Sequence, residues 1–292
     1  MQGIVNVFKP QNFTSHDCVA ILRGVTGIKK IGHTGTLDPM ATGVLPCCIG
    51  KATRIIEYLD NDLKEYECTM RMGMTSDTMD IWGNITYTEH VVIPDDDRII
   101  RTLKSFEGNI EQIPPKYSAV RVNGRRLYEY ARAGKDVDIR PRKVMIQSID
   151  ILSIINDEVR FKMKCGKGTY VRSVCHDAGE LLGTGAVMTQ LCRTSNGAFK
   201  AEDAVDIREI KSSSAEMIRN IIRPFYEFLN FRKIHVGEKE AKALSDGKAI
   251  YSAGVFEKNE KLSVYTDDIF VGVCVYNEGS IKAHKIFNTE IK

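Results

Sequence analysis

The sequence predicts an α+β protein built on a mixed sheet, with a small β-rich domain at its C-terminal end. Strand-like and helix-like segments follow one another irregularly, without the βαβ repeat of a doubly wound sheet. The pattern changes after Phe231, where several short strand-like segments follow one charged helix. The 292 residues, 43% of them hydrophobic, suffice for one large globular domain and one small one. We therefore expect domains at residues 1–231 and 232–292.

The larger domain is expected to mix strands and helices along its whole length. Alternating apolar residues predict a strand at residues 66–72. The clearest helix covers residues 95–106, because three aspartates stand at the positive end of its dipole and a glycine follows it. Ser15 is expected to cap a helix that runs to about Gly27. The other expected strands lie at residues 4–8, 146–155, 158–165 and 186–193, and the other expected helices at residues 51–59 and 171–182.

The smaller domain is expected to begin with a short charged helix at residues 237–245. Short strands are expected to follow at residues 253–256, 261–265, 269–276 and 281–287. About sixty residues is small for a domain that must fold alone, so we expect close packing against the larger domain.

Composition and cysteine spacing narrow the class of protein. The net charge of +3 indicates no particular partner. The eight cysteines are scattered and form no Cys-x-x-Cys pair, so no metal site is expected and reduced thiols in the cytoplasm are the simplest explanation. We find no signal peptide and no apolar run of ~18 residues, and therefore expect a cytoplasmic protein outside membranes. Residues 166–169 lack P-loop spacing and residues 183–185 lack the third glycine of a dinucleotide motif, so no cofactor is expected.

The most informative segment is residues 32–43, Gly-His-Thr-Gly-Thr-Leu-Asp-Pro-Met-Ala-Thr-Gly. Its glycines permit sharp bends, and Pro39 disfavours a helical conformation at Asp38. A single carboxylate is thereby held in a loop beside a strand-like segment, as a reactive group would be. The alternative is a surface turn in which Asp38 bonds its own backbone.

This segment, followed by Gly-Lys-Ala-Thr-Arg at residues 50–54, resembles the signature of the TruB family. The family makes pseudouridine in the T-loop of tRNA, so the resemblance implies a pseudouridine synthase catalytic domain. It also implies a stand-alone, cofactor-free isomerase that acts on uridine 55. Three further segments match the family in the expected order, although each alone would suit ordinary packing: residues 64–66, 168–173 and 191–194.

The resemblance also implies a role for each matching residue. Asp38 corresponds to the indispensable aspartate, which attacks C1′, attacks C6 of the base or removes the C2′ proton; the sequence does not choose among these routes. Arg172 would pair with that aspartate and keep it ionised. The remaining matches concern the flipped nucleotide: Tyr66 would stack on the uracil near C5, Tyr170 and Leu191 would line the uracil pocket, and His33 would take the place of the extruded base.

A basic insertion at about residues 114–143 is expected to clamp RNA, as in similar bacterial members of the family. Between Lys116 and Lys143 there are nine basic and three acidic residues, interleaved with tyrosines. Phosphates attract cations and unstacked bases attract aromatic faces. The alternative is a solvated amphipathic helix. The residues expected to contact RNA are Lys116, Arg121, Arg125, Arg126 and Arg132.

The C-terminal segment resembles a PUA-like RNA-binding domain, notably at residues 240–247. The expected partner is the T-stem-loop of tRNA, bound by a monomer that needs no obligate protein partner. Two other functions remain open: a guide-RNA-dependent pseudouridine synthase subunit, and a non-catalytic tRNA-binding or folding factor. The basic clamp favours the stand-alone enzyme over the former, and the set of Asp38, Tyr66 and Arg172 argues against the latter.

Overall fold

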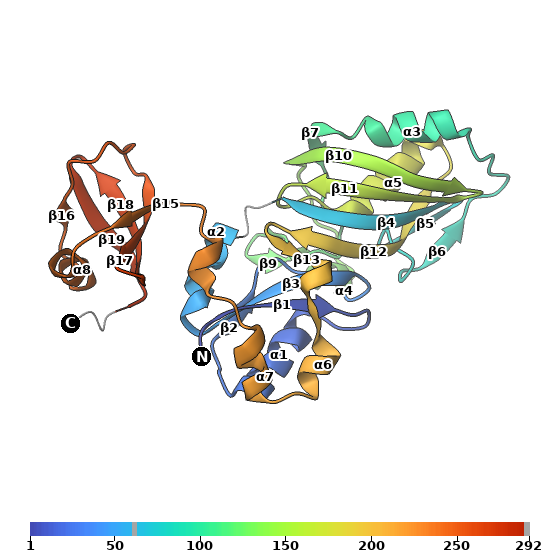
Figure 1. Ribbon diagram of the computed structural model, residues 1–292. Coiled ribbons are helices and arrows are strands. Elements are labelled where there is room, and N and C mark those ends of the chain that lie inside the picture. Colours follow the sequence, from blue (N-terminus) through green and yellow to red (C-terminus); the bar gives the residue numbers. More distant parts are fainter. Residues whose placement is uncertain (60–62, 289–292) are drawn as a thin grey trace.

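A computed structural model describes residues 1–59 and 63–288 (Figure 1). Its main feature is a mixed sheet in which β1 pairs with β14, and β3 with β12, in parallel, while the other neighbours are antiparallel. The strands in spatial order are β14 (Val205–Asp206), β1 (Gly3–Lys9), β3 (Thr42–Ile49), β12 (Ala186–Asn196), β4 (Lys64–Met72), β11 (Glu158–Cys165), β10 (Arg142–Ile155) and β7 (Gly108–Gln112), with β2 (Ile31–His33) beside β3 and β13 (Phe199–Lys200) beside β12.

Helices pack on both halves of this sheet. α5 (Val171–Leu182) packs on β12 and β4, and α3 (Asp96–Lys104) packs on α5 and β10. In the other half, α1 (Ser15–Thr26) contacts α6 (Ile207–Lys211) and α7 (Ala215–Ile221). Short helices complete the chain: η1 (Gly50–Ile55), α2 (Ile56–Leu59), η2 (Ala201–Asp203) and η3 (Phe225–Phe228).

A second sheet lies at the C-terminal end, beside the main sheet in Figure 1. It is covered by α8 (Glu238–Ser245), whose Ala241 and Leu244 are fully buried. Its strands in spatial order are β15 (Arg232–His235), β17 (Lys261–Thr266), β18 (Ile269–Asn277), β19 (Ser280–Ile286) and β16 (Ile250–Tyr251).

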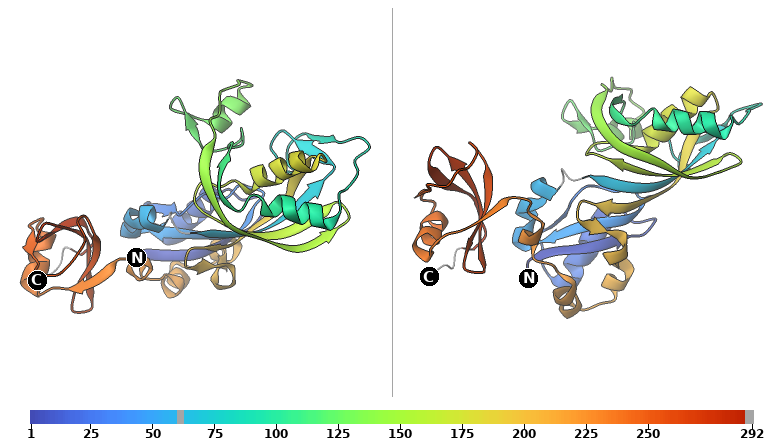
Figure 2. Two further views of the ribbon diagram at one scale, coloured as in Figure 1. Left: turned by 90° about the horizontal axis from the view of Figure 1, so that it is seen from above. Right: turned by 45° about the horizontal axis from the view of Figure 1, so that its top comes forward.

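Two hairpins extend from the main sheet. One joins β5 (Met74–Ser76) and β6 (Ile85–Tyr87). The other consists of β8 (Arg121–Val122) and β9 (Arg125–Arg126), followed by α4 (Leu127–Arg132). This second segment stands away from the main sheet as the green projection in the left view of Figure 2.

Local sequence signals predicted several elements correctly. The strand at residues 158–165 and the helix at residues 171–182 have the predicted bounds, and Gly183 ends the helix in a left-handed conformation. Ser15, however, does not cap α1. Thr14 does, because its hydroxyl and Asp17 form a reciprocal capping box, which leaves the Ser15 side chain free to turn inward.

Of two other predicted elements, one is confirmed and one is wrong. Residues 51–59 are helical as predicted, as a 3-10 helix followed by one α-helical turn, and the Thr53 hydroxyl donates to the Gly50 carbonyl within it. Residues 253–256 form no strand. There the Gly254 amide donates to the Ser252 hydroxyl, and the Phe256 ring lies against Gly254, so the chain bends instead of extending.

The two sheets are joined by η1 and by an aromatic cluster. Lys51 Nζ donates to the Phe287 carbonyl at 2.8 Å, and Arg54 donates to the Ile286 carbonyl at the end of β19. Phe225 packs edge-on against Phe270, with ring centroids 5.8 Å apart. The residues 50–54 noticed in the sequence therefore hold the C-terminal sheet against the rest of the fold.

Replacing Phe225 by alanine tests this junction. Phe225 is 3% exposed, so its loss should lower the free energy of unfolding by about 3–5 kcal/mol. Tyr251→Ala is the matched control, since Tyr251 lies on the C-terminal sheet but is 79% exposed, and should change stability by at most about 0.5 kcal/mol. Thermal and urea unfolding measure both; equal effects would contradict a buried junction.

Candidate active site

Asp38 lies in the loop between β2 and β3, and hydrogen bonds fix the backbone on either side of it. The inward-turned Ser15 hydroxyl accepts from the Leu37 amide at 2.9 Å and donates to the Leu37 carbonyl at 3.1 Å. The Pro39 carbonyl accepts from the Asn12 amide at 3.0 Å and from Lys9 Nζ at 3.4 Å. The backbone at Asp38 is therefore held by β1 and the start of α1.

The earlier part of the loop is held by β12. Arg193, fully buried, donates to the Gly35 carbonyl at 3.2 Å and to the Val44 carbonyl at 2.7 Å. Asn196 donates to the Thr34 carbonyl at 2.8 Å. Gly43 has φ 107°, and a Cβ there would stand 2.2 Å from the Arg193 carbonyl oxygen. Glycine is needed at this point for close approach to β12 rather than to a ligand.

Arg172 binds Asp38 across the fold. It stands in the first turn of α5, where the helix dipole disfavours a cation, and its side chain is 5% exposed. Arg172 Nη2 lies 3.0 Å from Asp38 Oδ2. Nη2 also donates to the Tyr117 carbonyl, and Nη1 donates to the Thr78 carbonyl, both at 3.1 Å. The guanidinium thus joins the Asp38 loop to two other segments.

A second carboxylate, missed in the sequence, completes this arrangement. Asp80 Oδ2 lies 3.2 Å from Arg172 Nη1, and the Asp80 side chain is 7% exposed. Its Oδ1 accepts from the Thr78 hydroxyl at 2.7 Å and from the Trp82 amide at 3.0 Å. The only sequence signal was Arg172 itself, whose place in the first turn of a helix is unfavourable for a cation. That placement indicates that a partner exists but does not identify Asp80 as the partner.

A cavity of about 260 Å³ opens beside the Asp38–Arg172 pair. This is somewhat below the ~300–1,000 Å³ usual for ligand pockets and suits a single nucleoside. The Tyr170 backbone is fixed there by the side-chain amide of Gln112, which donates to its carbonyl at 3.0 Å and accepts from its amide at 2.8 Å. Of the residues predicted for this site, the cavity brings together Asp38, Tyr66, Tyr170, Arg172 and Leu191. His33 lies at the end of β2, outside the cavity lining.

Burial dominates the titration of this site. It raises the pKa of Asp38 above its usual value; the Arg172 guanidinium opposes that rise, and the Asp80 carboxylate adds to it. Burial likewise raises the pKa of Tyr66 and of Tyr170. Because the phenols stay protonated, they can donate hydrogen bonds inside the cavity.

The five predicted clamp residues lie outside this cavity; Lys116 precedes the projecting segment, and the other four lie on it. Lys116 Nζ pairs with Asp136 at 2.9 Å, and both side chains are well exposed. Arg126 and Arg132 lie over the Tyr128 ring, at 5.8 and 5.4 Å from its centroid. Across the β8–β9 hairpin Arg121 pairs with Arg126 and Arg125 pairs with Val122, and Arg121 and Arg125 are both exposed. The alternative, a solvated amphipathic helix, corresponds to α4, which has a buried Leu127 but only six residues.

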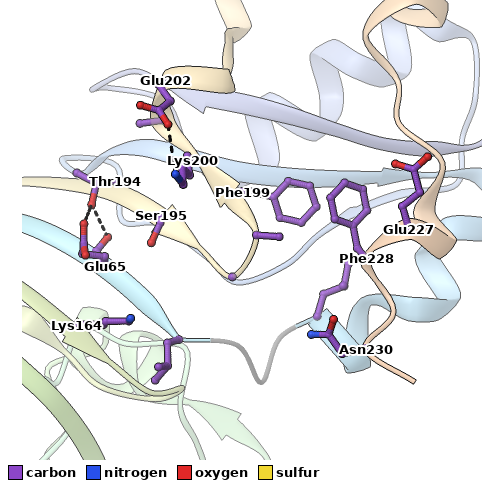
Figure 3. Close-up of a pocket in the computed structure, with 15 residues that line it drawn as sticks. Glu65, Lys164, Thr194, Ser195, Phe199, Lys200, Glu202, Glu227, Phe228 and Asn230 are labelled. Carbon is purple, nitrogen blue, oxygen red and sulfur yellow. Dashed lines mark hydrogen bonds and ion pairs between the residues drawn. The ribbon is translucent and has the colours of Figure 1, made fainter. Parts of the chain in front are cut away.

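A larger cavity, of about 890 Å³, lies away from Asp38, between the β12–β13 turn and η3 (Figure 3). Phe199 and Phe228 pack together on one side of it, with ring centroids 4.4 Å apart. Its charged groups are mixed, and Lys200 pairs with Glu202 at 3.5 Å. By volume alone, this cavity would be the first candidate for the active site. The Asp38–Arg172 ion pair and the two tyrosine phenols, however, line the smaller cavity.

The structure describes residues 1–59 and 63–288, and two kinds of feature are absent from that part of the chain. No three His, Cys, Asp or Glu side chains come together there as a metal site would require. No helix in that part of the chain is both long and apolar enough to cross a membrane.

Comparison with known proteins agrees with this geometry. Residues 23–171 match the TruB family pseudouridylate synthase (N terminal domain), and residues 172–230 match the tRNA pseudouridylate synthase B C-terminal domain. The chain is 40% identical over 277 residues to tRNA pseudouridine synthase B of Clostridium tetani, covering 94% of this chain and 95% of that one. It is 41% identical over 296 residues to tRNA pseudouridine synthase B of Clostridium perfringens, covering 99% of this chain and all of that one.

Solved structures show the same architecture. A chain from "Crystal Structure of a Cbf5-Nop10-Gar1 Complex" aligns with a TM-score of 0.75 and 27% identity, over 99% of this chain and 86% of that one. A chain from "Structure of H/ACA RNP bound to a substrate RNA containing 2'-deoxyuridine" aligns with a TM-score of 0.73 and 25% identity, over 99% and 86%. The α+β fold with a mixed main sheet and a β-rich C-terminal half-barrel is thereby confirmed.

Fold and site together define a pseudouridine synthase, an isomerase that works on uridine. Within that class, the chain belongs to the TruB family, as its sequence predicted, and has tRNA pseudouridine synthase activity.

Asp80→Asn and Arg172→Gln should move the pH dependence of pseudouridine formation in opposite directions. Asp80→Asn removes a charge that raises the pKa of Asp38, so the acid limb of kcat/KM should move to lower pH. Arg172→Gln removes the opposing charge, so the limb should move to higher pH. Both variants should also lose at least about tenfold in rate, because each removes an interaction of the network that positions Asp38. A loss of about 1.4 kcal/mol in transition-state stabilisation already lowers the rate tenfold. Acid limbs unchanged in both would show that the network does not tune Asp38.

Proposed function

We propose that this protein converts uridine 55 in the T-loop of tRNA to pseudouridine, with Asp38 as its essential carboxylate. The observation that carries the proposal is the half-buried Asp38 held 3.0 Å from the buried Arg172, beside a nucleoside-sized cavity. The reaction breaks the N1–C1′ bond and rejoins the same ring through C5. Because it consumes no electrons and transfers no group to a second molecule, we propose that it needs no cofactor.

In this proposal Asp38 acts on the reacting nucleotide and Arg172 keeps its carboxylate ionised and oriented. Attack at C1′, attack at C6 and removal of the C2′ proton all require an ionised carboxylate at a fixed position. The bonded backbone around Leu37 and Pro39 supports such a role, since it limits where Asp38 can move.

Tyr66, Tyr170 and Leu191 are proposed to hold the uracil. Each lines the cavity, and together they offer flat aromatic and apolar surfaces to a planar ring. A base within a folded tRNA must be flipped out, at a cost of a few kcal/mol. We propose that His33 fills the space that the base leaves.

RNA binding is assigned to two other parts of the chain. The exposed arginines and Tyr128 of the projecting segment suit phosphates and unstacked bases. We propose that residues 1–231 form the catalytic domain, with this segment as its clamp, and that residues 232–292 form a PUA-like RNA-binding domain. A cytoplasmic monomer without an obligate protein partner suffices for this scheme.

The main competing function is a guide-RNA-dependent synthase subunit. The two structural relatives come from a Cbf5-Nop10-Gar1 complex and from an H/ACA RNP with its substrate RNA. The stand-alone enzyme is better supported, because identity is 40–41% to the bacterial tRNA pseudouridine synthases and 25–27% to those chains. A non-catalytic tRNA-binding factor would not need the buried pair at the cavity.

Tritium release tests the catalytic proposal. Purified protein is incubated with an unmodified tRNA transcript carrying tritium at C5 of uridine, without metal or guide RNA. Wild type should release one tritium per tRNA, and Asp38→Asn should release none while binding tRNA normally. A transcript with cytidine at position 55 identifies the target uridine. Tight binding without release by wild type would refute the enzymatic proposal and leave a tRNA-binding or folding factor.

Salt dependence tests the clamp. Replacing Arg121 by glutamine should reduce the slope of log affinity against log salt by about 0.7–0.9, the contribution of one phosphate contact. Arg101→Gln is the matched control, because Arg101 is equally exposed but lies on α3. An identical slope for wild type and Arg121→Gln would place the RNA elsewhere.

A further inference from the structure

Ser118 lies where the clamp joins the active site. The carbonyl of the preceding residue, Tyr117, accepts from Arg172 at 3.1 Å. The carbonyl of Ser118 itself accepts from the amide of Tyr128, in the clamp helix, also at 3.1 Å. The carbonyl that binds Arg172 and the carbonyl that binds the clamp helix therefore belong to consecutive residues.

The side chain of Ser118 lines the same cavity as Asp38 and is only 5% exposed. Among the residues that the structure describes, its hydroxyl has no hydrogen-bond partner of normal geometry, although it interacts with the Tyr170 hydroxyl and so opposes the rise that burial causes in the pKa of Tyr170. Leaving a buried hydroxyl unpaired costs about 1–3 kcal/mol. A polar ligand in this cavity would give the hydroxyl a partner.

We propose that the Ser118 hydroxyl donates a hydrogen bond to a carbonyl oxygen of the flipped uracil. This contact rests on the proposed function, which brings a uridine into the cavity. The aromatic and apolar lining covers the faces of the ring, so the edge of the ring, with its two carbonyl oxygens, is left for polar groups. A serine hydroxyl rotates freely, and can therefore follow an oxygen that moves when the ring turns.

The contact would help the reaction more than it helps binding. Hydrogen bonds strengthen when negative charge develops on the acceptor, and the uracil oxygens take up charge as the N1–C1′ bond weakens. The hydrogen bond would also couple the clamp to the reaction, because the backbone at Ser118 is held by Arg172 on one side and by the clamp helix on the other.

Single-turnover conversion of the tRNA transcript tests the contact. Ser118→Ala should slow conversion about tenfold, with the dissociation constant for tRNA changed by at most about twofold. Ser118→Cys, which keeps the size but donates weakly, should give an intermediate rate. Thr184→Val is the matched control: Thr184 is 1% exposed and its hydroxyl also has no partner among the described residues, but it lies between α5 and β12, outside the cavity lining. It should convert at the wild-type rate.

Substrates with 2-thiouridine or 4-thiouridine at the target identify the atom contacted. Sulfur accepts hydrogen bonds weakly, so the rate penalty of Ser118→Ala should shrink on whichever thio-substrate replaces the contacted oxygen. A full penalty on both substrates, or wild-type rates for Ser118→Ala and Ser118→Cys, would overturn the contact. No conversion by wild type would instead refute the proposed function itself.

Discussion

The active site depends on the buried guanidinium of Arg172. A cation removed from water is tolerated only when its donors are paired, and Arg172 is paired with two carboxylates and two backbone carbonyls. These partners come from three separate segments: the Asp38 loop, the turn at Thr78 and Asp80, and the base of the clamp at Tyr117. Each segment is held in place because it supplies an oxygen atom that pairs with the buried guanidinium. The same pairing opposes the rise that burial causes in the pKa of Asp38.

Around this charge, side-chain hydrogen bonds hold the Asp38 loop in place. The side chains of Ser15, Lys9, Arg193 and Asn196 bond its carbonyls from β1, α1 and β12. A loop of glycine and threonine would otherwise sample many conformations, and ordering it costs roughly 1–2 kcal/mol per residue. Paying that cost during folding leaves Asp38 already placed when RNA arrives.

The two parts proposed to bind RNA attach to this centre through short contacts. The clamp reaches it at Tyr117 and Ser118, one link from Arg172. The C-terminal sheet reaches the rest of the fold through Lys51 and Arg54 of η1, which also contacts β2 near His33. The surfaces proposed for RNA recognition are therefore connected to the Asp38 site by only a few residues.

The sequence alone determined what depends on neighbouring residues. The helix at residues 171–182 and the strand at residues 158–165 follow from local periodicity and end signals, and the Asp38 segment was recognisable because its residues are consecutive. Only the tertiary structure decided what depends on distant contacts. Asp80 lies 92 residues from Arg172 in the chain, and nothing local marks it as a partner. Ser15 looked like a helix cap, but Leu37, brought close by folding, takes its hydroxyl. A single sequence records which groups are present, whereas packing decides which of them meet.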